Sequence, residues 1–241
     1  MAISSEGKVK MKKDPIIAKA LERGQSALSE YDSKLLIEKY GVTTCDEKLT
    51  GTADEAVAAA AEFGYPVVLK ACGAEISHKT EREVVKVGLK REDEVREAFD
   101  KIKANLGGDP FEGILVQKMV AGERELAIGL IRDPQFGPCV MFGLGGIFTE
   151  ILRDTSFRVA PITKEDALQM MDDIRAKAIL GPVRGKPPVD RELLAKALVG
   201  LAKIGIEQEN VAEIDVNPLI VAPDGKPIAV DALVVLSKNG S

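Results

Sequence analysis

The chain has 241 residues, of which 45% are hydrophobic and 29% are charged, and its formal net charge at pH 7 is −5. This balance is typical of a soluble globular protein, and the scattered basic residues and the 4% aromatic content argue against nucleic acid as a partner. The sequence has no apolar stretch long enough to span a membrane and no hydrophobic signal segment at its start, so we expect no membrane partner and a cytoplasmic protein.

The first half of the chain contains signals for helices and strands behind a polar, basic arm. Pro15 suits the first turn of a helix, Ser29 caps the next helix, and Thr52 with Glu55 forms a capping box. A continuous apolar run predicts a buried strand that ends in Lys70. In chain order we expect helices at 15–23 and 30–40, a strand at 42–44, a helix at 52–63, strands at 66–70 and 84–89, and a helix at 91–105.

A glycine and proline break at 107–110 separates this half from a second group of elements. The chain finishes in a hairpin that turns at Asp224-Gly225. We therefore divide the chain into an arm with its first helix at 1–25 and two subdomains at 26–110 and 111–241. In the second subdomain we expect strands at 113–120, 125–132 and 140–143, helices at 163–174 and 190–204, and hairpin arms at 211–221 and 228–236.

The final hairpin places three oxygen-bearing side chains on one face. Asp215 and Asn217 are two residues apart on one strand, and pairing around the turn puts Asn217 nearly opposite Asp231. Three widely spaced cysteines and a single histidine disfavour zinc, so these oxygens suit Mg²⁺, which also accepts substrate phosphates and water. The alternative is a solvent-facing polar edge, which Pro218 within the strand favours.

Three further features suit a phosphorylated ligand, each with an ordinary alternative. Lys70 ends a buried strand, where its ammonium could contact a phosphate or extend from the sheet into solvent. The strand at 116–120 opens into a glycine turn that suits an adenine edge, although most such stretches are only core and turn. The glycine-rich run 143–146 lacks the lysine and hydroxyl residue of a P-loop. His78, the only histidine, is by composition an ordinary solvated residue.

Several stretches in this order resemble one family, the ATP-grasp beta subunits of ADP-forming acetyl-CoA synthetases, which are relatives of succinyl-CoA synthetase. The resemblance extends from about residue 26 to residue 236 and implies an α+β, ATP-grasp fold of two α/β subdomains with the nucleotide between them. The matching stretches are Leu28-Ser29-Glu30-Tyr31, Gly64 to Lys70, Ser77-His78-Lys79, Val116 to Met119, Asp133 to Gly146, and Asp215 to Leu219.

The resemblance implies a reaction in which an acyl-CoA, ADP and phosphate give the acid, CoA and ATP. His78 matches the histidine that passes a phosphoryl group to ADP, and neutral imidazole is a suitable nucleophile for that role. Phosphoryl transfer requires in-line positioning and neutralised oxygens. For that neutralisation Lys79, Lys70 and Arg158 are the candidates, with Lys70 matching the nucleotide-binding lysine of the family.

The remaining family positions concern the metal, the nucleotide and a partner. Asn217 and Asp231 match Mg²⁺ ligands, with Asp215 close by. A chain with one histidine and no Rossmann-like CoA fingerprint implies an alpha subunit that holds CoA, the acid and a second phosphorylated histidine. We expect a twofold-symmetric α2β2 hetero-oligomer. The nucleotide contacts match Gln117, Lys118, Met119 and Val120, with Glu125 as a further contact.

The sequence departs from the family pattern at one point. After His-Lys-Thr-Glu the family continues through a Gly-Gly pair, whereas this chain has Arg82-Glu83-Val84-Val85, so the shape of the His78 loop is not predicted. Two alternatives remain, an ATP-grasp ligase without a phosphohistidine and a nucleotide-sensing regulatory subunit. The preferred acid and the choice between ADP and GDP are left open.

Overall fold

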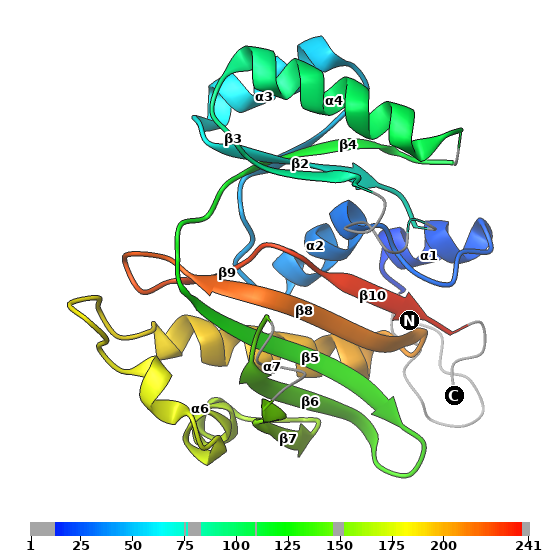
Figure 1. Ribbon diagram of the computed structural model, residues 1–241. Coiled ribbons are helices and arrows are strands. Elements are labelled where there is room, and N and C mark those ends of the chain that lie inside the picture. The colour runs from blue at the N-terminus through cyan, green and yellow to red at the C-terminus, as the bar shows by residue number, and fades with distance from the viewer. Residues whose placement is uncertain (1–12, 75, 77–82, 109, 147–151, 238–241) are drawn as a thin grey trace.

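The computed structural model describes residues 13–74, 76, 83–108, 110–146 and 152–237, which form two parts built on antiparallel sheets (Figure 1). The smaller part is a four-stranded sheet covered on one side by two helices, and the larger part is a six-stranded sheet with helices below it. This mixture of helices with antiparallel sheets confirms the expected α+β class.

The four-stranded sheet has the strand order β1-β4-β2-β3. Helices α3 and α4 pack on it through alanines of α3 and through Val95, Phe99 and Ile102, which recur on one side of α4. Thr52 and Glu55 form the predicted capping box at the start of α3. The elements are β1 (Glu47–Thr50), α3 (Ala53–Phe63), β2 (Val67–Cys72), β3 (Val85–Leu89), α4 (Glu92–Leu106) and β4 (Gly113–Lys118).

The six-stranded sheet has the order β10-β8-β5-β6-β7, and β9 pairs with β8 beside β10. Helix α7 packs on β5 and β6, and α6 packs on α7 and β7, so the apolar residues of the sheet and of both helices form one core. The elements are β5 (Arg124–Asp133), β6 (Gly137–Leu144), β7 (Thr155–Val159), α6 (Lys164–Asp173), the short η1 (Lys177–Leu180), α7 (Arg191–Glu207), β8 (Val211–Val221), β9 (Pro227–Ala229) and β10 (Leu233–Leu236).

Elements on both sides of the proposed division at residue 110 pack with the other part of the molecule. Helix α1 (Pro15–Glu22) and helix α2 (Glu30–Lys39) contribute Ile17, Leu36 and Ile37 to the core of the six-stranded sheet. Strand β4 follows residue 110 but pairs with β1 and β2 of the smaller sheet. In Figure 1, α2 consequently lies between the two sheets, and the chain crosses from one sheet to the other after β4.

Most predicted elements are present, but several differ from the prediction. The strand expected at 42–44 is only an isolated bridge at Thr44, and the strand that pairs with β4 begins at Glu47. Strand β7 and the short helix η1 were not predicted, the strand expected at 66–70 continues to Cys72, and the second arm of the final hairpin is divided into β9 and β10. None of the helices in the described part of the chain combines the length and the apolar character needed to cross a membrane.

Candidate functional site

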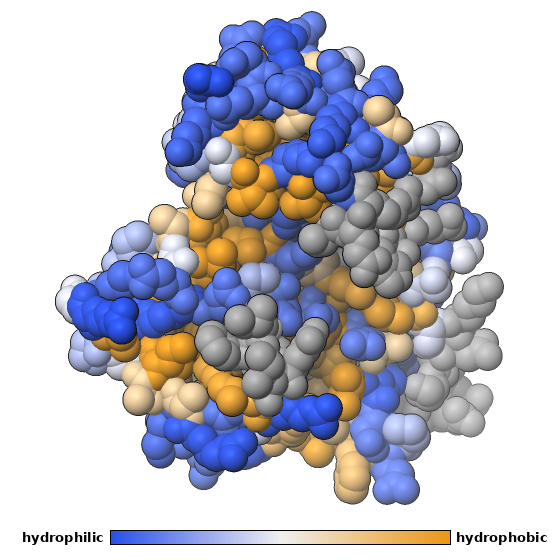
Figure 2. Space-filling model, viewed as in Figure 1, coloured by the Kyte–Doolittle hydropathy of each residue, from blue (hydrophilic) through white to orange (hydrophobic). Residues whose placement is uncertain are grey.

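A pocket of about 320 Å³ opens at the seam between the two parts. Its walls come from the segment after β2, from the start of α2 and from the final hairpin. Figure 2 shows an indentation between the upper and lower parts, with hydrophobic surface visible along it. The polar residues that line the pocket are Glu30, Asp215, Asn217 and Asp231, and Gly73, Ala74 and Ile76 form the opposite wall.

The register of the hairpin brings the three predicted oxygen ligands together. Leu233 pairs with Asp215, and Ala229 pairs with Leu219, so Asn217 lies opposite Asp231 between these two pairs. Asp215 and Asn217 share one face of β8 because side chains alternate along a strand. This face borders the pocket, which agrees with the arrangement expected from the turn at Asp224-Gly225.

The charges of this face suit a cation. Partial burial in the pocket, followed by the nearby carboxylates of Glu213 and Asp231, raises the pKa of Asp215 to about 6. Within the described residues, no three His, Cys, Asp or Glu side chains gather as a metal cluster. Asp215, Asp231 and Asn217 supply two carboxylates and one amide to the pocket. This set of oxygen donors fits Mg²⁺, an ion that completes its coordination shell with substrate phosphates and water.

The glycine-rich end of β6 lies against the same hairpin. The Gly146 N–H donates to Oδ1 of Asn217 over 2.9 Å, and the Gly145 N–H donates to the carbonyl of Glu125 over 2.9 Å. Gly146 has a φ of +59°, and a Cβ there would lie 1.7 Å from Oε2 of Glu125. The left-handed backbone favours glycine at this position, and Gly146 contacts both Asn217 and the carboxylate of Glu125.

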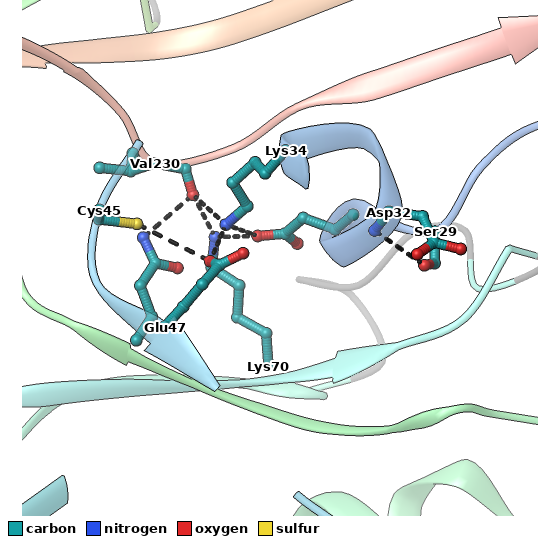
Figure 3. Close-up of polar contacts among 9 residues, drawn as sticks. Ser29, Asp32, Lys34, Cys45, Glu47, Lys70 and Val230 are labelled. Atoms are coloured by element: carbon teal, nitrogen blue, oxygen red, sulfur yellow. Dashed lines mark hydrogen bonds and ion pairs between the residues drawn. The ribbon is translucent and has the colours of Figure 1, made fainter. Parts of the chain in front are cut away.

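Lys70 lies in a group of buried charged residues that sequence reasoning did not identify. Glu30, Lys34, Glu47 and Lys70, here called the seam cluster, meet between α2 and the four-stranded sheet (Figure 3). Burial lowers the pKa of Lys34, but the carboxylates of Glu30 and Glu47 raise it above its ordinary value. The spacing of Glu30 and Lys34 marks a helical ion pair in the sequence, although nothing in that spacing shows that the pair is buried.

The predicted adenine contacts lie where the chain crosses between the sheets. Gln117 is buried and donates from Nε2 to the carbonyl of Val230 over 3.1 Å. Lys118 and Met119 are exposed, and the Met119 N–H donates to the carbonyl of Pro66 over 3.2 Å. Val120, partly buried, completes this crossing segment.

Arg158 does not join these residues. It pairs with Val140 of β6, whose side chain lies in the core beneath the sheet, and its guanidinium bonds to Asp173 of α6 over 2.5 Å. Arg158 is thus on the helix-covered face, opposite the face of Asp215. The catalytic candidates His78 and Lys79 lie outside the described residues.

Comparisons with known proteins agree with this architecture. A family model described as an ATP-grasp domain matches residues 19–236. The beta subunit of acetate–CoA ligase (ADP-forming) I from Pyrococcus furiosus is 44% identical over 213 residues, covering 87% of this chain and 91% of that subunit. Acetate–CoA ligase (ADP-forming) I from Archaeoglobus fulgidus is 38% identical over 232 residues, covering 95% of this chain and 33% of that longer protein.

Solved structures of dinucleotide-forming acetyl-coenzyme A synthetase 1 from Ca. Korarchaeum cryptofilum are also similar. The complex with coenzyme A, Ca-AMPCP and HgCl⁺ has a TM-score of 0.86 at 44% identity and covers 92% of this chain and 98% of that chain. The complex with coenzyme A and Mg-AMPPCP, whose phosphohistidine segment points towards the nucleotide binding site, has a TM-score of 0.82 at 43% identity with the same coverage. The predicted ATP-grasp fold is thereby confirmed.

Proposed function

The chain belongs to the ATP-grasp domain family and, within it, to the beta subunits of ADP-forming acetate–CoA ligases, and on that premise we propose that its nucleotide binds at the pocket between the two sheets. It is therefore a subunit of a ligase that converts an acyl-CoA, ADP and phosphate into the acid, CoA and ATP. The observation that supports the binding site best is the meeting of an oxygen-rich hairpin face with Glu30, the buried partner of Lys70, in one pocket.

In the proposed transfer step, His78 holds the phosphoryl group. The bond between phosphorus and the imidazole nitrogen breaks as a terminal oxygen of ADP forms a new bond to phosphorus. The other ring nitrogen keeps its proton, so the products are ATP and neutral histidine. Lys79 and Lys70 neutralise the phosphate oxygens, which is the main electrostatic requirement of phosphoryl transfer. Support comes from the Korarchaeum structure in which the phosphohistidine segment points towards the nucleotide binding site, and from Gly73, Ala74 and Ile76, which line the pocket just before His78 in the chain.

The hairpin and the crossing segment have separate tasks in this proposal. Asn217 and Asp231, with Asp215 beside them, would hold a Mg²⁺ ion that neutralises phosphate oxygens of the nucleotide. The crossing segment from Gln117 to Val120 would contact the adenine, and Glu125 would contact the nucleotide near the glycine-rich end of β6. Arg158 has no part in the proposed site, because it faces the helices.

We also propose a partner alpha subunit that provides CoA, the acid and the first histidine of the relay, in an α2β2 assembly. The naming of relatives as beta subunits supports a partner, as does the Archaeoglobus ligase, of which this chain covers only 33%. Three buried cysteines without disulfides suit a reducing compartment, so we place the enzyme in the cytoplasm.

The test is His78→Ala in the enzyme assembled with its alpha subunit. We expect the variant to lose acyl-CoA-dependent ATP formation while it retains Mg·ADP binding, measured by calorimetry. In the parent enzyme, labelled phosphate on this chain should be labile in acid and stable in base, as expected for phosphohistidine. Undiminished turnover in the variant would favour a ligase without a phosphohistidine, and Mg·ADP binding without any transfer in the assembled parent enzyme would favour a regulatory subunit.

A further inference from the structure

The seam cluster contains charged side chains that are almost completely buried. Lys34 is 1% exposed, Glu30 is 4% exposed and Lys70 is 9% exposed. Removing charges from water is costly, so such residues remain charged only where their partners are held in good geometry. In the seam cluster two acids and two bases compensate one another.

Two ion pairs of the seam cluster each join a residue of α2 to a residue of the four-stranded sheet. Glu30 and Lys34 belong to α2, which packs with the six-stranded sheet, whereas Lys70 and Glu47 belong to the four-stranded sheet. Oε1 of Glu30 accepts from Lys34 over 2.9 Å and from Lys70 over 2.8 Å, and Lys34 also bonds to Glu47. Each part of the molecule therefore contributes one acid and one base.

A backbone carbonyl of the metal-site hairpin joins the same network. The carbonyl of Val230 accepts from Lys70 over 2.8 Å and from Gln117 over 3.1 Å, and Figure 3 shows Lys70 and Lys34 converging on it. Val230 directly precedes Asp231. The position of the Lys70 ammonium is thus tied to the hairpin strand that bears a proposed Mg²⁺ ligand.

An ammonium group has three N–H donors. Two of those on Lys70 are directed to Glu30 and to the carbonyl of Val230, and Lys70 donates no third hydrogen bond within the described part of the chain. This arrangement restricts the third donor to a narrow range of directions, which lowers the entropy lost when a phosphate oxygen binds there.

We propose that Glu30 is a positioning residue, which orients Lys70 towards the nucleotide phosphates across the seam. This inference rests on the proposed function, because it takes Lys70 to be the phosphate-binding lysine. Lys34 bonds to Glu30, to Glu47 and to the carbonyl of Val230, whereas Glu47 has no hydrogen bond to Glu30 or Lys70 in the described structure.

The experiment compares Mg·ADP affinities of the folded full chain by calorimetry. We expect Glu30→Gln to weaken binding about tenfold, the usual size for one lost charged hydrogen bond. Lys70→Met should weaken binding at least as much, and the double variant Glu30→Gln/Lys70→Met should bind no more weakly than Lys70→Met alone. If Glu30 had only a structural role, independent of Lys70, the effects of the two substitutions would instead add.

Glu47→Gln is the matched control, since it removes a buried carboxylate of the same cluster that does not touch Lys70. It should lower the melting temperature while leaving the Mg·ADP affinity within twofold of the parent value, a limit well inside the tenfold effect expected for Glu30. If Glu30→Gln does not fold, Glu30→Asp, which keeps the charge but shortens the reach, should show the same loss of affinity.

The outcomes separate the two proposals. If Lys70→Met leaves the affinity unchanged, the proposed role of Lys70 is wrong. If Lys70→Met weakens binding but the Glu30 variants do not, or if the two effects add, the positioning role of Glu30 is overturned while the proposed function stands.

Discussion

At the scale of single residues, burial gives common side chains uncommon properties. Glu30 and Lys34 are four residues apart on a helix, a spacing that on a surface stabilises by only about 0.3–0.5 kcal/mol. In the seam between the sheets the same pair is almost fully buried, and its carboxylate also holds Lys70. The opposite case is Asp215, whose pKa rises because it is partly buried and because its charged neighbours Glu213 and Asp231 are also acids.

Because two cysteine thiols are buried, we expect the folded protein to lose stability in alkaline solution. Burial raises the pKa of Cys45 to about 12 and that of Cys72 to about 11. The unfolded thiols ionise near pH ~8.5, so their contribution to stability is complete below that pH and is lost as the pH rises towards the folded values. We expect the free energy of unfolding to fall by up to about 1.4 kcal/mol per pH unit for each thiol in this range.

Urea unfolding between pH 8 and pH 10.5 tests this expectation with Cys45→Ser. The variant retains every lysine and tyrosine of the parent chain, so the difference between the two slopes reports Cys45 alone. The variant should lose stability less steeply above pH ~9. Equal slopes for both proteins would contradict the proposed burial effect.

At the scale of elements, some structures follow from the chemistry of neighbouring residues, and others depend on packing between residues far apart in the chain. The hairpin forms as its turn and its alternating strands suggest, because both are properties of neighbouring residues. Strand β7 has no such local mark and forms because β6 presents an open edge to it. The contact between α2 and α7 likewise depends on one small residue, Gly200, whose absent Cβ would lie 2.1 Å from the carbonyl oxygen of Tyr40.

Gly200→Ala should therefore separate α7 from the end of α2. We expect a loss of about 1–3 kcal/mol in the free energy of unfolding, the usual cost of overpacking a core. Gly181→Ala is the control, because a Cβ there meets only the carbonyl of Ala178 at 3.4 Å and its φ is −76°. Denaturant midpoints that shift equally for the two variants would show that the close approach is not what Gly200 provides.

At the scale of the whole molecule, the two sheets meet along a seam that holds the pocket, the seam cluster and the crossing segment. A ligand bound there contacts residues of both parts and of α2, so binding should stabilise the folded chain as a unit. The expected gain is about 2.7 kcal/mol at a ligand concentration one hundred times the dissociation constant, and each kcal/mol raises the melting temperature by about 2–4 °C in a chain of this size.

Thermal melts with ADP, with and without Mg²⁺, measure this gain. We expect excess EDTA to remove most of the ADP-dependent shift, and Asp231→Asn to reduce it, because the hairpin oxygens hold the metal in our proposal. Asp224→Asn changes an exposed carboxylate at the turn of the same hairpin and should retain the full shift. An unchanged shift in EDTA would contradict a metal role for this face.

The sequence by itself determined the features that depend on near neighbours. It predicted the capped helices, a buried strand that contains Lys70 although that strand continues to Cys72, and a hairpin that places Asn217 opposite Asp231. Each follows from periodicity, capping or turn chemistry within a few residues. The family resemblance also led to the ATP-grasp fold, because its stretches are matched in order along the chain.

Only the tertiary structure decided which distant residues share an environment. It assigned α2 to the core of the six-stranded sheet and β4 to the smaller sheet, although the chain order suggests the reverse for both. It buried Glu30 and Lys34 against Lys70 and turned Arg158 away from the pocket. The physical reason is that burial and pairing across a seam depend on how whole faces pack, and a spacing of residues along the chain does not contain that information.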